Sequence, residues 1–201
     1  MILLRASNRR QASTNGEAHL RSARDASRNG RRIPTLTPVG AIVRGAVAGV
    51  AGTAAMDALL FARYRRNGGT STAEEWELSE SLSSWDDAHA PALVGKRLVE
   101  GVFDTELPST RAPLVNNLTH WAFGMFSGVQ YGIVAGSLPN PRILYGLPFG
   151  ATVWATGYVI LPAAKLYQPI WKYDLTTLAN DLSAHVVYGL ATAGALRVLA
   201  K

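Results

Sequence analysis

Five polar side chains lie in or beside long apolar stretches of this chain, where proton or ion chemistry is a natural use for them. Asp181 and His185 are four residues apart, so on a helix they share one face and can hydrogen-bond. Asn116 and His120 have the same spacing. A carboxylate beside an imidazole can form a proton relay or a pH sensor. The candidates for proton handling are Asp57, Asn117, His120, Asp181 and His185.

A structural role is the alternative for each of these residues, because all of them fall near the ends of apolar stretches. Each histidine can hydrogen-bond a neighbouring helix, and Asp57 can pair with Arg63 or Arg65 at the level of the lipid headgroups. A metal site needs three or four converging ligands, and only two well-placed histidines are present. The chain has no cysteine, which excludes a disulfide framework and a thiolate nucleophile. The sequence predicts no metal and no cofactor.

Signatures of common enzymes are missing from the sequence. It contains no Gly-x-Ser-x-Gly, no phosphate-binding Gly-Lys-Ser/Thr loop, no Gly-x-Gly-x-x-Gly and no His-Glu-x-x-His. We therefore expect a protein without catalytic activity.

Four stretches are long and apolar enough to cross about 30 Å of hydrocarbon, which takes roughly 20 helical residues. A soluble helical bundle is the alternative, but the second stretch has no charged residue with which to form a water-facing side. The sequence predicts an all-α fold, a four-span transmembrane helical bundle over residues 37–201. The predicted spans are 38–62, 115–138, 143–166 and 175–199, with an acidic and amphipathic loop at 67–112 that contains a capping box at Thr72 and Glu75.

Small residues recur on these stretches at the spacing of one helical turn. Each glycine costs a helix in water about 1 kcal/mol relative to alanine, whereas in lipid the same spacing lets two backbones approach closely. We expect a packing seam, and a narrow pore is the alternative. The glycines concerned are Gly45, Gly49, Gly124, Gly128, Gly132 and Gly136.

Residues 1–36 form a basic tail, with eight arginines before residue 33, and we expect it to be disordered. An organellar transit peptide is the alternative. No aromatic residues alternate with these arginines, so contact with anionic lipid is favoured over nucleic acid. Arginines next to the first span favour cytoplasmic termini, and hence a multi-pass protein of the cytoplasmic membrane. The small-residue surfaces would also allow a homo-oligomer.

Residues 117–124 resemble residues 181–189, since each contains a histidine followed by x-x-aromatic-Gly. Two helical hairpins in the same orientation would explain this, and chance or shared membrane composition is the alternative. The run Thr119-His120-Trp121-x-Phe123-Gly124, with Gly146-x-x-Phe149-Gly150 and His185-x-x-Tyr188-Gly189, resembles uncharacterised small bacterial inner-membrane proteins of the YagU-like type. The resemblance covers residues 38–200, implies a multi-span protein without known catalysis, and transfers no catalytic residue.

Together these observations predict a membrane protein with a structural or accessory role. The first alternative is a small transporter or channel that uses Asp57, His120, Asp181 and His185. The second is a membrane-embedded enzyme or metal-binding protein.

Overall fold

A computed structural model of the chain describes residues 36–78, 82–138 and 141–201, and the predicted basic tail lies outside the described residues except for Leu36. Helices make up the described part of the chain, in which no β-strand occurs. This confirms the all-α class. The α-helices are α2 (Pro38–Arg66), α3 (Ala73–Glu77), α4 (Ala90–Phe103), α5 (Ala112–Gly136), α6 (Gly146–Ala163) and α7 (Leu175–Leu199). Short 3₁₀ turns precede three of them: η1 (Ser109–Arg111), η2 (Ile143–Tyr145) and η3 (Ile170–Lys172).

Local sequence explains where several helices begin. The Thr37 hydroxyl accepts a hydrogen bond from the Gly40 N–H, and Pro38 occupies the first turn of α2, where its missing N–H costs nothing. Asp174 caps α7 by accepting from the Thr177 N–H at 2.9 Å, and its hydrogen bonds to Thr177 lower the pKa of this carboxyl. The predicted capping box is present at the start of α3.

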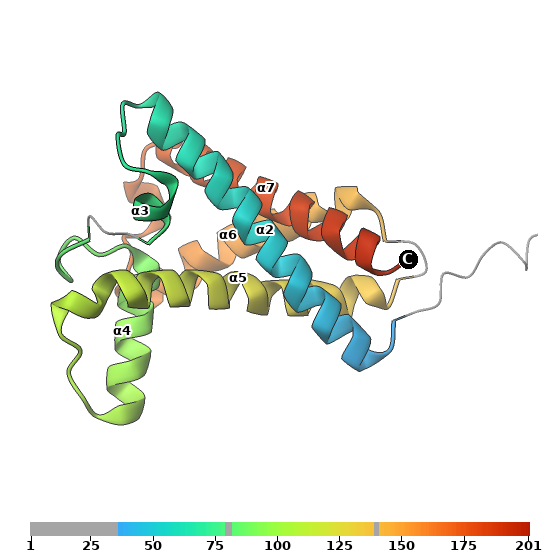
Figure 1. The fold of residues 1–201 in the computed structure, drawn as a ribbon, viewed down its shortest axis with the longest axis horizontal. Helices are drawn as coiled ribbons and strands as arrows, with labels where there is room; N and C mark the ends of the chain where they lie inside the picture. The colour runs from blue at the N-terminus through green and yellow to red at the C-terminus, as the bar shows by residue number, and fades with distance from the viewer. Residues whose placement is uncertain (1–35, 79–81, 139–140) are drawn as a thin grey trace, which may run out of the picture. The chain divides into compact units, whose positions relative to one another are not determined.

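Four long helices, α2, α5, α6 and α7, run alongside one another, and each is antiparallel to the next of these four along the chain (Figure 1). Helix α2 packs against both α5 and α7, and α6 packs against α7. The guanidinium of Arg44, near the start of α2, donates to the carbonyl of Leu199 at the end of α7. The backbone N–H of Leu36 donates to the carbonyl of Gly136. The start of α2 and the ends of α5 and α7 therefore lie at one end of the bundle.

Close backbone contact joins α2 to α5. A Cβ added at Gly49 would lie 2.5 Å from the Gly124 carbonyl oxygen, and one added at Gly128 would lie 2.5 Å from the Gly45 carbonyl oxygen. Gly132 faces Gly45 and the Ala41 carbonyl in the same way, whereas a Cβ at Gly136 would make only 3.3 Å side-chain contacts. These glycines therefore face another helix, and we refer to them as the α2–α5 seam.

A second glycine contact joins α6 to α7 and shows how the faint sequence repeat maps onto the fold. Gly189 lies against Gly146 and Gly150, as Gly128 lies against Gly45 and Gly49. If the α2–α5 pair and the α6–α7 pair are superimposed by these contacts, Gly128 corresponds to Gly189. The sequence repeat instead pairs Gly124 with Gly189, so its register is one helical turn away from that of the packing.

Within the described residues, three helical segments rather than the predicted four are long and apolar enough to cross a membrane: Pro38–Arg66, Ile143–Ala163 and Leu175–Leu199. The exception is α5, which contains the predicted span 115–138 as far as Gly136 but has no stretch of 18 residues as apolar as those in the other three helices. It has no charged residue between Val115 and Leu138, yet Asn116, Asn117, His120 and Gln130 lower its mean hydropathy. The absence of charged residues therefore does not by itself show that a segment is apolar enough to cross a membrane.

The segment predicted as a loop at 67–112 contains α3 and α4. Helix α4 runs across the start of α5 (Figure 1) and turns its small residues toward it, so that Gly95 lies against Val115 and Thr119. Leu98, Val102 and Phe103 stay exposed. At the same end of the bundle, Trp171 and Leu175 are 77% and 84% exposed. This end therefore presents apolar side chains that nothing in the described part of the chain covers.

Candidate functional site

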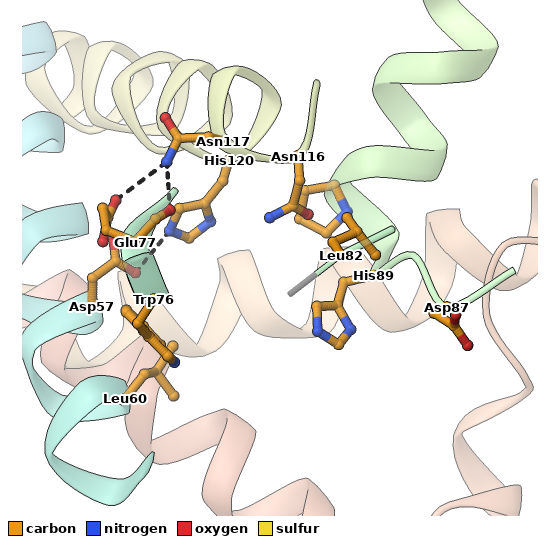
Figure 2. A pocket seen from close by; sticks show the side chains of 11 residues that line it. Asp57, Leu60, Trp76, Glu77, Leu82, Asp87, His89, Asn116, Asn117 and His120 are labelled. Carbon is orange, nitrogen blue, oxygen red and sulfur yellow. Dashed lines mark hydrogen bonds and ion pairs between the residues drawn. The ribbon is translucent and has the colours of Figure 1, made fainter. Parts of the chain in front are cut away.

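A cavity of about 410 Å³ lies between α2, α3, α5 and the segment 82–91 that leads into α4 (Figure 2). It is lined by Asp57, Leu60, Trp76, Glu77, Leu82, Asp87, His89, Pro91, Asn116, Asn117 and His120. Three of the five predicted site residues, Asp57, Asn117 and His120, are among them.

Asp57 and His120 meet where the α2–α5 seam ends. Asp57 is two helical turns after Gly49, and His120 is one turn before Gly124, so both continue the faces along which the glycines bring the backbones together. The imidazole Nε2 lies 2.9 Å from Asp57 Oδ1. Asp57 is only 7% exposed, and its Oδ2 has no hydrogen-bond partner among the described residues.

Glu77 joins α3 to α5 beside this pair. Asn117 Nδ2 donates to the Glu77 backbone carbonyl at 2.8 Å, and Trp121 Nε1 donates to Glu77 Oε1 at 2.7 Å. Figure 2 shows Glu77 beside Asp57 and His120. The contact between Glu77 and Trp121 was not predicted, because the two residues are 44 positions apart in the sequence. The capping box predicts that a helix begins near Thr72, but it does not indicate which helix α3 contacts.

Both members of the second predicted pair lie on α7, and Asp181 also interacts with Tyr158 of α6. His185 Nδ1 lies 3.2 Å from Asp181 Oδ1 and 2.9 Å from the Asp181 carbonyl oxygen. Neither residue lines the cavity. The two histidines therefore lie in separate pairs and do not converge on a common polar cavity.

Asp57 does not form an ion pair with Arg63. Such a pair is one of the structural roles that the sequence suggests for Asp57. The Arg63 guanidinium donates to the Asn180 carbonyl and to Ser183 Oγ, both at 2.8 Å. Arg65 donates to the Ser71 carbonyl. Arg63 therefore links the end of α2 to the start of α7, and Asp57 takes its partner from α5 instead.

Metal ligation finds no support in the geometry. Within residues 36–78, 82–138 and 141–201, no group of three or more histidine, cysteine, aspartate or glutamate side chains is placed to hold a metal ion. The cavity carries donors and acceptors for a polar ligand, but its described lining contains no hydroxyl or thiol nucleophile paired with a base.

Comparison with known proteins gives a family likeness without an activity. Neither the curated proteins nor the solved structures contain a match to this chain, so no named relative supports the YagU-like resemblance. Residues 103–193 match the sequence profile of a family described as a protein of unknown function, DUF1440. The match includes His120, Asp181 and His185 but excludes α2 and therefore Asp57. Over α5, α6 and most of α7, the chain is thus similar to an uncharacterised family.

Proposed function

We propose that the protein is a non-enzymatic integral membrane protein with a structural or accessory role, whose helices are held together by small-residue seams. The proposal rests on the contacts that the seam glycines and the two histidines make inside the bundle. The glycines of the seam face another helix and leave no pore between α2 and α5. His120 joins α5 to α2, and His185 pairs within α7. These contacts give both histidines a partner without transport or catalysis.

Exposed apolar side chains on the candidate spans support contact with lipid. Val43 and Val47 on α2, Val159 on α6 and Val198 on α7 are exposed. In water such surfaces would favour association. We expect Trp171 and the exposed edge of α4 to lie at the membrane interface, where tryptophan and amphipathic helices are favoured.

We also infer that α5 crosses the bilayer, although it is less apolar than the other three helices. The Arg44 to Leu199 contact puts the start of α2 and the end of α7 at one end of the bundle. Three crossings would leave these ends on opposite sides, so α5 supplies the fourth. Its seam face is covered by α2, and its outer side carries exposed Leu118, Phe126 and Val134. The arginines before residue 33 favour the cytoplasm for both termini.

Proton-linked transport is the second candidate, and the Asp57–His120 pair in a cavity favours it. A buried carboxylate bonded to an imidazole is a common arrangement for moving a proton. The separate location of His185 counts against a relay that uses both histidines.

Proton flux in reconstituted liposomes separates the two candidates. With a pH-sensitive dye inside and an imposed pH gradient, we expect the wild-type protein to give no flux above protein-free liposomes. The variant His120→Ala/His185→Ala should behave in the same way. A wild-type flux that disappears in this variant, while circular dichroism shows an intact fold, would replace the structural proposal with the transport one.

A further inference from the structure

We propose that the cavity between α2, α3 and α5 binds a small organic ammonium ion, through N–H donation to Asp57. This goes beyond a structural role, and it rests on the cavity's charge, on one unsatisfied oxygen and on the residues of its walls.

Acidic side chains outnumber basic ones in the described lining of the cavity. Its described lining carries three carboxylates, from Asp57, Glu77 and Asp87, and two imidazoles, from His89 and His120, but no lysine or arginine. Even if both imidazoles are protonated, the carboxylates outnumber them. Figure 2 shows Asp57, Glu77 and His120 on one side of the cavity and Asp87 and His89 on the other. Such a site attracts a cation and repels an anion.

One oxygen of the cavity residue Asp57 has no hydrogen-bond partner among the described residues. Asp57 is 7% exposed, its Oδ1 is taken by His120, and its Oδ2 is buried without a partner among the described residues. Leaving a buried charged acceptor unsatisfied is costly, so buried polar atoms nearly always have a partner. Asp57 lines the cavity, so a turn of its carboxylate would present this oxygen to an N–H donor there.

The walls decide which kind of cation fits. Leu60, Leu82 and Pro91 supply apolar surface, and Trp76 supplies an aromatic ring of the type that attracts ammonium groups. A volume of about 410 Å³ suits a small organic molecule. A bare metal ion fits less well, because no group of three ligand-type side chains in the described ranges converges on a point. The ligand class is therefore an alkylammonium ion with N–H donors.

Two sources could supply this chemistry: a free amine, or the ethanolamine headgroup of a lipid. Asp57 lies 19 residues after Pro38, which is about 29 Å along the helix. Because this is close to the thickness of the hydrocarbon core, Asp57 lies near a membrane interface, where both sources are within reach. A quaternary choline headgroup has no N–H, and phosphatidylcholine therefore serves as the reference lipid.

The test uses the full chain in phosphatidylcholine nanodiscs and follows the thermal unfolding midpoint. We expect n-butylammonium chloride to raise the midpoint by several degrees, while n-butanol and sodium chloride at equal concentration do not. Asp57→Asn should weaken the binding of n-butylammonium at least tenfold. The control Asp181→Asn removes a carboxylate outside the cavity and should bind as wild type does.

Adding phosphatidylethanolamine to the nanodiscs identifies the source. If the headgroup occupies the cavity, the midpoint rises and n-butylammonium adds nothing further; if a free amine is the ligand, its effect is equal in both lipids. Both results support the ammonium site. Equal effects of n-butylammonium and n-butanol on the wild-type protein would overturn it, whether or not Asp57→Asn folds. An unchanged affinity in a folded Asp57→Asn would do so as well.

Discussion

Gly128→Ala is expected to destabilise the bundle by about 3 kcal/mol, the upper part of the usual range for overpacking. The added methyl would lie 2.5 Å from the Gly45 carbonyl oxygen and closer still to the Gly49 Cα. Both are backbone atoms, so no side-chain rotation can relieve the clash. The two helices would have to separate along the α2–α5 seam. The midpoint of thermal unfolding in detergent, followed by circular dichroism, measures the effect.

Gly194→Ala is the matched control, because it makes the same chemical change in a long helix of the same bundle. A Cβ at Gly194 of α7 would meet no atom within 4 Å. We expect this variant to be as stable as wild type or more stable by up to about 1 kcal/mol, since alanine favours a helix over glycine. If the two variants shift the midpoint alike, the close approach of α2 and α5 is contradicted.

His120→Ala is expected to cost about 3 kcal/mol, the lower end of the range for removing one partner of a buried ion pair. Asp57 would then be left with neither oxygen bonded in a largely buried position. His120 itself is 26% exposed in its side chain, which keeps the effect below the maximum. Chemical or thermal unfolding in detergent would report the loss.

A double-mutant cycle shows whether this cost comes from the pair. In an Asp57→Asn background, His120→Ala should cost much less, because no buried carboxylate remains. His185→Ala is the comparison, and we expect it to cost about 0.5 kcal/mol or less. Its pair with Asp181 lies within one helix and is partly exposed on both side chains. Equal costs for the two histidine variants would contradict the assigned difference between the pairs.

Helical periodicity and apolar length were sufficient to place the long helices. The predicted span 175–199 coincides with α7, and the first span differs only because α2 continues to Arg66. These features are local, since they depend on residues within one helix. The apolarity expected of the second span was wrong, because α5 lacks charge without being strongly apolar, as Asn116, Asn117 and Gln130 show.

The partners of the polar residues could not be predicted, because they depend on which helices meet. Asp57 and His120 are 63 residues apart, and the sequence around each of them does not identify the other as its partner. Arg63 was considered as a partner for Asp57 from proximity in sequence, yet it reaches α7 instead. One further clue was present in the sequence: Asp57 lies at helical spacing from Gly49, and His120 from Gly124, which puts both on the seam faces.

The central claim is that lipid surrounds these helices, and fractionation of cells that express the full chain tests it most directly. After lysis and high-speed centrifugation, we expect the protein in the membrane pellet, where it should resist an alkaline carbonate wash and dissolve only with detergent. A monodisperse protein recovered from the supernatant without detergent would contradict the account.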